Sequence, residues 1–167
     1  MDIRFLISIV LVGLSCEGSH STAPPIPSAS PRSLLVAADL TRVDRVEAIP
    51  ASVMDAYSKL FPVSRNDALG LANPGESWQC CCSLSRDGPP RRRLIFAGGS
   101  PTLWFLYFEE GGLAVDYHFI TFALDSPGQA EPLESLAFQE WPQSLGDVKR
   151  LAATAQERHY SGRVGQW

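Results

Sequence analysis

Four runs of aromatic and branched residues, separated by short breaks rich in glycine and proline, occupy the middle of this 167-residue chain. The breaks are Asp87-Gly88-Pro89-Pro90, Gly98-Gly99-Ser100-Pro101 and Gly111-Gly112. Apolar runs of this length are typical of strands, and breaks this short are typical of hairpin turns. The pattern therefore predicts a β-meander with strands at 78–84, 92–97, 102–109 and 113–124. A fifth strand is expected at 135–140.

Two helices are expected to flank this sheet. The segment 50–61 begins with Pro50, ends before Pro62, and has one apolar stripe made by Val53, Met54, Tyr57, Leu60 and Phe61. A final helix is predicted to begin after Ser144 as its cap, with Asp147 in the first turn. Segregation of helices from strands indicates the α+β class. We therefore expect an antiparallel meander of four to five strands with two helices packed on one face.

Two shorter segments before the sheet also have readable patterns. Asn73-Pro74-Gly75-Glu76 has the residues of a tight turn, because proline presets φ and glycine accepts a positive φ. The residues at 42–48 are compatible with a strand whose register the pattern does not define.

The Gly111-Gly112 break leads to a prediction of strand register. A two-residue loop would pair Glu110 with Leu113 and so define which side chains share a face. One face would be apolar and lie under the helices, with Trp104, Leu106 and Phe108 opposite Phe119, Tyr117 and Val115. The other face would be mixed, with Phe105, Tyr107 and Glu109 opposite His118, Asp116 and Ala114. A four-residue loop at 98–101 would add Leu94 and Phe96 to the mixed face and pair Arg92 with Asp116.

The candidate site consists of the polar residues on this mixed face. Arg92, Tyr107, Asp116 and His118 could bind a small ligand or a protein. His118 could instead act as the base of a small hydrolase, supported by Asp116 or Glu109. Asp116 and His118 are two apart on one strand, so their side chains would run parallel, and no known catalytic motif accompanies them. The pattern therefore favours binding over catalysis.

Three consecutive cysteines, Cys80, Cys81 and Cys82, raise the alternatives of metal binding and thiol redox chemistry. On a strand, Cys80 and Cys82 would face one way and Cys81 the other, which does not suit a tetrahedral metal site. We therefore expect no metal and no cofactor. Packing is the favoured role of these thiols, and a thiol redox factor is the alternative.

The overall charge argues against nucleic acid as a partner. The formal net charge is -4, and the basic run Arg91-Arg92-Arg93 lacks interleaved aromatic residues. A solvated strand entrance is the simpler interpretation of that run.

The first sixteen residues have the pattern of an export signal. Arg4 precedes the apolar stretch 5–14, which is too short to span a bilayer, and small residues stand just before Cys16. The segment Val12-Gly13-Leu14-Ser15-Cys16 resembles the lipobox of bacterial lipoproteins, in which the cysteine is lipidated and tethers the protein to a membrane. Gly13 stands where that motif usually has a branched aliphatic residue, so cleavage and release is the alternative. The predicted organisation is a signal peptide at 1–15, a Pro/Ser-rich linker at 16–33, one domain at 34–160 and a tail at 161–167.

A second resemblance concerns the folded part. Pro90 to Gly98, together with Tyr107 to Gly112, is similar to a group of small uncharacterised exported bacterial proteins. This resemblance implies export and no particular activity. We thus expect an exported protein at the periplasm, at the inner or outer membrane face, or outside the cell. Its expected partners are a membrane, through lipid on Cys16, and an envelope protein or small ligand.

Overall fold

The computed structural model describes residues 29–61, 70–80, 87–125, 128–138 and 140–158. Its helices are α1 (Pro31–Ala37), α2 (Ala51–Leu60) and α3 (Leu145–Ala152), and a 3₁₀ turn, η1, spans Val46–Ala48. Its strands are β1 (Thr41–Val43), β2 (Leu71–Ala72), β3 (Arg92–Gly99), β4 (Leu103–Glu110), β5 (Asp116–Leu124), β6 (Ala130–Ala137) and β7 (Gln156–Arg158). The predicted α+β class and the helices before and after the sheet are confirmed.

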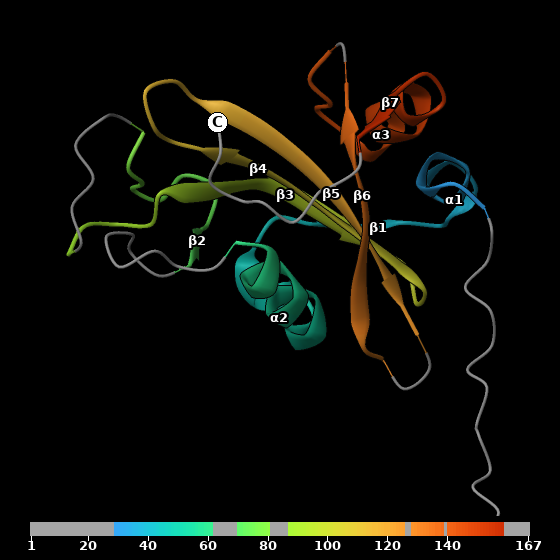
Figure 1. The fold of residues 1–167 in the computed structure, drawn as a ribbon, viewed down its shortest axis with the longest axis horizontal. Helices are drawn as coiled ribbons and strands as arrows, with labels where there is room; N and C mark the ends of the chain where they lie inside the picture. The colour runs from blue at the N-terminus through green and yellow to red at the C-terminus, as the bar shows by residue number, and fades with distance from the viewer. Residues whose placement is uncertain (1–28, 62–69, 81–86, 126–127, 139, 159–167) are drawn as a thin grey trace, which may run out of the picture.

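The strands form one sheet with the order β1-β3-β4-β5-β6-β7, and β2 pairs with β3 (Figure 1). The β2–β3 pair is parallel and the other pairs are antiparallel. The predicted meander is therefore the β3 to β6 part of the sheet. The long strands β3, β4 and β5 form its centre.

Helices cover both faces of this sheet, so the expectation of two helices on one face is wrong. On one face, Val53 and Tyr57 of α2 pack against Leu106 and Phe108 of β4. On the other face, α1 and α3 cover a second cluster that includes Phe105 of β4. Because the central strand is apolar on both sides, each side needs a covering layer. Figure 1 shows α2 on one side of the sheet and the pair α1 and α3 on the other.

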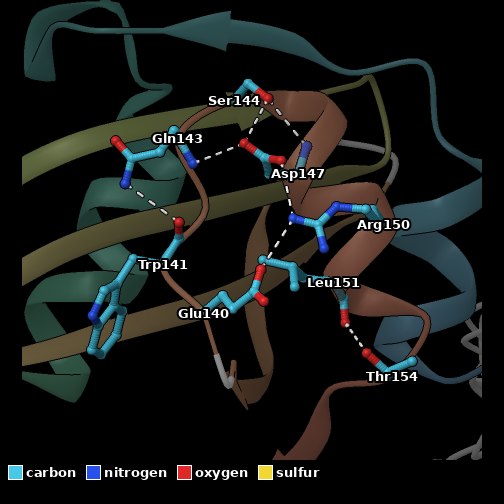
Figure 2. Close-up of polar contacts among 8 residues, drawn as sticks. All are labelled: Glu140, Trp141, Gln143, Ser144, Asp147, Arg150, Leu151 and Thr154. Atoms are coloured by element: carbon cyan, nitrogen blue, oxygen red, sulfur yellow. Dashed lines mark hydrogen bonds and ion pairs between the residues drawn. The ribbon is translucent and has the colours of Figure 1, made fainter.

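The predicted cap of the last helix is confirmed. The backbone N–H of Asp147 donates to Ser144 Oγ at 3.1 Å, and the carboxylate of Asp147 accepts from the backbone N–H of Gln143 at 3.1 Å (Figure 2). These bonds satisfy donors that a helix N-terminus leaves open. The Ser144 hydroxyl also donates to the Asp147 carboxylate at 3.0 Å, and this bond, followed by those from the Gln143 N–H and from Arg150, lowers the pKa of Asp147.

The turn at 73–76 is also confirmed. Gly75 has a φ of +82°, and the backbone N–H of Glu76 donates to the carbonyl of Asn73 at 3.1 Å. The buried Asn73 amide then joins this turn to η1, because its Oδ1 accepts from the backbone N–H of Val46 at 2.7 Å and its Nδ2 donates to Glu47 at 3.0 Å.

Several element boundaries differ from the prediction. In the strand expected at 78–84, residues 78–80 are not a strand, and 81–84 lie outside the described residues. The segment 42–48 is divided between β1 and η1, and β6 begins at Ala130 instead of residue 135. The helix α1 begins at Pro31, within the segment predicted to be a linker, and buries Pro31 and Leu35.

The largest correction concerns the register of β4 and β5. Glu110 pairs with Asp116 and Tyr107 pairs with Phe119, so the loop spans residues 111–115 instead of two glycines. The observed register differs from the expected one by three residues. Because three is an odd number, each β5 side chain lies on the other face of the sheet from the one predicted. Neither glycine has the positive φ that a two-residue hairpin turn needs. Gly111 is required for another reason, since a Cβ there would collide with the backbone carbonyl of Gln79.

A β-bulge changes the faces of β3. Leu94 pairs with Phe108 and Phe96 pairs with Tyr107, so Ile95 is an extra residue. Leu94 consequently joins the α2 side of the core, whereas Phe96 joins the α1 and α3 side. The expectation that these two residues share one face is wrong. The turn predicted at 98–101 is also shorter than expected, because Gly98 and Gly99 belong to β3 and the connection to β4 spans residues 100–102.

Candidate functional site

The residues predicted to form a ligand site do not converge. Tyr107 is 2% exposed in the core on the α3 side, where burial raises its pKa, whereas Arg92 and His118 lie on the α2 side. Asp116 is exposed where β5 begins. The predicted pair between Arg92 and Asp116 is wrong, because Arg92 binds Glu110 instead. The shifted register is the cause.

Three charged or titratable side chains from three adjacent strands meet under the end of α2. Arg92 Nη2 of β3 lies 3.0 Å from Oε1 of Glu110 in β4, and His118 Nε2 of β5 lies 3.4 Å from Oε2 of the same carboxylate. Arg91 Nε also lies 3.4 Å from Oε1 of Glu110. The side chains of Arg92, Glu110 and His118 are 9%, 15% and 15% exposed. We name Arg92, Glu110 and His118 the ion cluster.

Aromatic rings cover the ion cluster. Phe61, the C-cap residue directly after α2, has its ring centroid 4.7 Å from the guanidinium carbon of Arg92. The imidazole of His118 stacks on Phe108 with ring centroids 5.0 Å apart, and its edge meets Phe61 at 6.0 Å. A cation over an aromatic face is stabilised by the ring quadrupole. The last turn of α2 therefore positions a lid of apolar surface over the charges.

The ion cluster determines the charge state of Glu110. Burial alone would raise the pKa of Glu110, but the close approach of the His118 imidazole and the charge and hydrogen bond of Arg92 lower it to about 2. Burial opposes the charge of Arg92 as well, yet Tyr57 and Glu110 raise the pKa of its guanidinium. A general acid or base works best with a pKa near the working pH. Glu110 is therefore a fixed anion and not a proton carrier.

Glu109 cannot support His118 because the two side chains lie on opposite faces. Glu109 is 8% exposed and accepts a hydrogen bond from Arg93 Nε at 2.6 Å. The guanidinium of Arg93 in turn lies 4.9 Å from the centroid of the Trp78 ring. The predicted hydrolytic group of His118, Asp116 and Glu109 is therefore divided among separate positions.

Glu110 is the cluster residue that the sequence analysis missed. Arg92 begins β3 and pairs directly with Glu110 at the end of β4. Opposite charges at the two ends of a predicted hairpin are the sequence feature that could have indicated this ion pair. The assumed four-residue loop at 98–101 placed Arg92 beside Asp116 instead, and it left out the bulge at Ile95, so this pairing was missed. The predicted candidate His118 does lie in the ion cluster, beside Glu110 and not beside Asp116.

A second feature of the described residues is an exposed apolar surface around the β4–β5 loop. Its side chains are Leu113 at 96% exposure, Val115 at 38%, Tyr117 at 41% and Trp141 at 53%. The rings of Tyr117 and Trp141 contact each other with centroids 4.2 Å apart. We name these four residues the hairpin patch. Val115 and Tyr117 were expected under the helices, and that expectation is wrong.

The β4–β5 loop, which carries two residues of the hairpin patch, lies at one end of the sheet. Figure 1 shows the β4–β5 loop at the left end of the sheet, beyond α2 and α3, with α1 at the opposite end. Figure 2 shows the Trp141 ring pointing away from the polar contacts that surround the start of α3.

Other candidate features contribute little chemistry. Cys80 is exposed, and Cys81 and Cys82 lie outside the described residues. Within the described ranges no group of three His, Cys, Asp or Glu side chains could hold a metal ion. A shallow concavity beside α1 contains none of the predicted site residues and is lined by Ser30, Arg32, Ser33, Val36 and Ala153. No helix among the described residues is both long and apolar enough to cross a membrane.

Comparison with known proteins adds no relative. No family model, curated protein or solved structure matches this chain.

Proposed function

We propose that this protein is an exported, non-enzymatic interaction domain of the bacterial cell envelope, and that the hairpin patch is its binding surface. The observation that carries the proposal is the exposure of Leu113, 96%, beside the paired rings of Tyr117 and Trp141. Among the described residues, Val36 is the other large hydrophobic side chain that is exposed, and it lies on α1. Clustered exposed apolar side chains are typical of interaction sites.

The ion cluster supports a structural role in place of catalysis. Its three members join β3, β4 and β5 close to the base of the β4–β5 loop, and its carboxylate remains ionised. Arg92 and His118 both face the Glu110 carboxylate, at 3.0 and 3.4 Å, and so hold the three strand ends together. The loop is thus presented from a stiff base, which lowers the entropy lost when it binds a partner.

The leader supports an envelope location. The stretch 5–14 and the small residues before Cys16 favour export, and the lipobox-like end favours a lipid anchor on Cys16. Release after ordinary cleavage would leave the same domain free outside the cytoplasm. Intact-mass measurement of protein purified from bacterial membranes distinguishes these forms. We expect a chain that begins at Cys16 and carries a diacylglyceryl group, and a chain that retains Met1 would contradict export.

Capture from envelope extracts tests the binding surface. The full chain as bait is expected to retain an envelope component that a Leu113→Ser, Trp141→Ser double variant loses. A Val36→Ser variant is the matched control, because Val36 is also exposed but lies at the other end of the domain. Equal capture by all three baits would contradict the assignment of the hairpin patch.

A further inference from the structure

We propose that the hairpin patch docks on a lipid bilayer, with Leu113 and Val115 entering the acyl boundary and Tyr117 and Trp141 at headgroup level. This inference rests on the proposed function, because it names the partner of the same surface.

The loop has the chemistry of a shallow membrane insertion. Residues 111–115 read Gly-Gly-Leu-Ala-Val and carry neither a charge nor a hydrogen-bonding side chain. Leu113 is the most exposed large hydrophobic residue among those described. Lipid solvates such a side chain better than water does, and apolar groups of interfacial segments enter the bilayer by a few ångströms.

The backbone at the base of this loop is already hydrogen-bonded. The N–H of Gly111 donates to the carbonyl of Arg91 at 3.0 Å, and the carbonyl of Gly111 accepts from Arg91 Nε. Polar backbone groups that enter a membrane need partners, because the bilayer core supplies none. Arg91 therefore reduces the cost of bringing the loop into contact with lipid.

The aromatic pair stands behind the aliphatic tip. Tyr117 and Trp141 pack against each other and remain about half exposed. Tyrosine and tryptophan are enriched at membrane interfaces, because one part of each ring system is apolar and another can hydrogen-bond. An aliphatic tip followed by these rings matches the change in polarity across a bilayer surface.

The charges around the loop are nearly balanced. The guanidinium of Arg91 lies against the loop, 3.1 Å from where a Cβ on Gly112 would be, and an arginine there can pair with a lipid phosphate. Arg91 and Arg92 are offset by Glu110 and by the exposed Asp116. Apolar insertion must therefore supply most of the affinity, and salt should change the affinity little.

The size and shape of the patch favour lipid over a protein partner. Stable protein interfaces use roughly 20–30 residues on each side. The hairpin patch consists of four residues: Leu113 and Val115 in the β4–β5 loop, Tyr117 at the start of β5, and Trp141 before α3. A small apolar tip can be surrounded by a fluid bilayer, whereas a protein surface would need a matching cavity.

The tether is long enough for docking. Twelve residues, 17–28, lie between Cys16 and residue 29, and the thirteen Cα-to-Cα steps of a fully extended chain reach at most roughly 45 Å. Figure 1 places the β4–β5 loop and α1 at opposite ends of the sheet, whose central strand β4 has eight residues that span about 27 Å. A lipid on Cys16 and the hairpin patch can thus contact the same membrane.

Vesicle flotation of the mature chain, residues 16–167, carrying Cys16→Ala tests docking without the apolar leader and without the lipid anchor. The vesicles contain phosphatidylethanolamine with a quarter phosphatidylglycerol. We expect flotation with the vesicles and quenching of tryptophan fluorescence by brominated acyl chains. Adding Leu113→Glu should lower partitioning by at least about tenfold, whereas adding Val36→Glu should leave it unchanged. Raising salt from about 0.1 to about 0.5 M should change partitioning by less than about twofold.

The outcomes separate this inference from the proposed function. Absence of flotation, or equal effects of Leu113→Glu and Val36→Glu, would overturn membrane docking. If the chain then still captured an envelope protein in a Leu113-dependent way, the proposed function would stand with a protein partner. Loss of both lipid binding and capture would overturn both proposals.

Discussion

At the scale of single residues, Glu110 contributes stability through its ionised form. Its pKa is lowered from 4.5 to about 2, because the nearby His118 imidazole and the charge and hydrogen bond of Arg92 outweigh burial. Its contribution is therefore complete above pH about 4.5, the unfolded value, and is lost as the pH falls through about 2. A pKa difference of this size between the unfolded and folded states corresponds to about 3 kcal/mol in the free energy of unfolding.

Glu110→Gln is accordingly expected to lower the free energy of unfolding at pH 7 by about 3 kcal/mol. The variant should also lose less stability than the wild type between pH 4.5 and about 2. Urea unfolding at several pH values measures both effects. Glu140→Gln is the control, because Glu140 is 69% exposed in its pair with Arg150 and should contribute less than about 1 kcal/mol. Parallel pH profiles for the wild type and Glu110→Gln would contradict this role.

The two glycines of the β4–β5 loop differ in what a side chain would meet. A Cβ on Gly111 would strike the backbone of Gln79, whereas a Cβ on Gly112 would meet the flexible end of Arg91 at 3.1 Å. We expect Gly111→Ala to cost about 2 kcal/mol or more and Gly112→Ala less than about 1 kcal/mol. Thermal unfolding of the two variants provides the comparison. Similar melting temperatures would show that the segment at Gln79 does not approach the loop so closely.

At the scale of elements, Thr121 supports an irregular stretch of β6. Between Ile120 and Phe122 of β5, the pairing with β6 advances by one extra residue. The fully buried Thr121 hydroxyl compensates by donating to the carbonyl of Glu134 at 2.8 Å and accepting from its N–H at 3.4 Å. The shape of the strand thus depends on one side-chain hydroxyl.

Thr121→Val keeps the volume but removes these bonds, and we expect a loss of about 1–3 kcal/mol in the free energy of unfolding. Thr121→Ser keeps the hydroxyl and loses one methyl group, so its cost should be smaller, about 1 kcal/mol. Chemical denaturation ranks the two variants. A Thr121→Val protein as stable as the wild type would contradict the importance of the bulge.

How well the elements could be predicted depended on the range of the interactions that form them. Local rules were sufficient for α2, for the Ser144 cap of α3 and for the turn at Gly75. The side of the sheet on which each β5 side chain lies was predicted wrongly, because Gly111 was taken as a turn residue. A glycine is needed there because the backbone of Gln79, far away in the chain, approaches it closely. The bulge at Ile95 has no local signal, and the polar start of β6 does not show strand alternation. The ion cluster depends on all three strands, so the same errors hid Glu110.

At the scale of the whole molecule, one sheet serves two hydrophobic layers. Leu106 and Phe108 support α2, while Phe105 and Tyr107 of the same strand support α1 and α3. Because both layers share β4, loss of either cover exposes a face that the other cannot protect. We therefore expect the domain to unfold in one cooperative transition. The helix α1 belongs to this unit even though its first residues read as linker, since Arg32 Nη1 donates to the carbonyl of Ala155 at 3.0 Å.

The two neighbouring residues of α1 test this view. Leu35 is fully buried against the layer that α3 covers, whereas Val36 is 45% exposed. Leu35→Ala should lower the free energy of unfolding by about 2–5 kcal/mol, and Val36→Ala by less than about 1 kcal/mol. Calorimetry should show a single transition for both variants, shifted down strongly only in Leu35→Ala, because the shared central strands couple the two layers. A Leu35→Ala protein that melts like Val36→Ala would mean that α1 is an appendage, and that the face beneath it is stable without that cover.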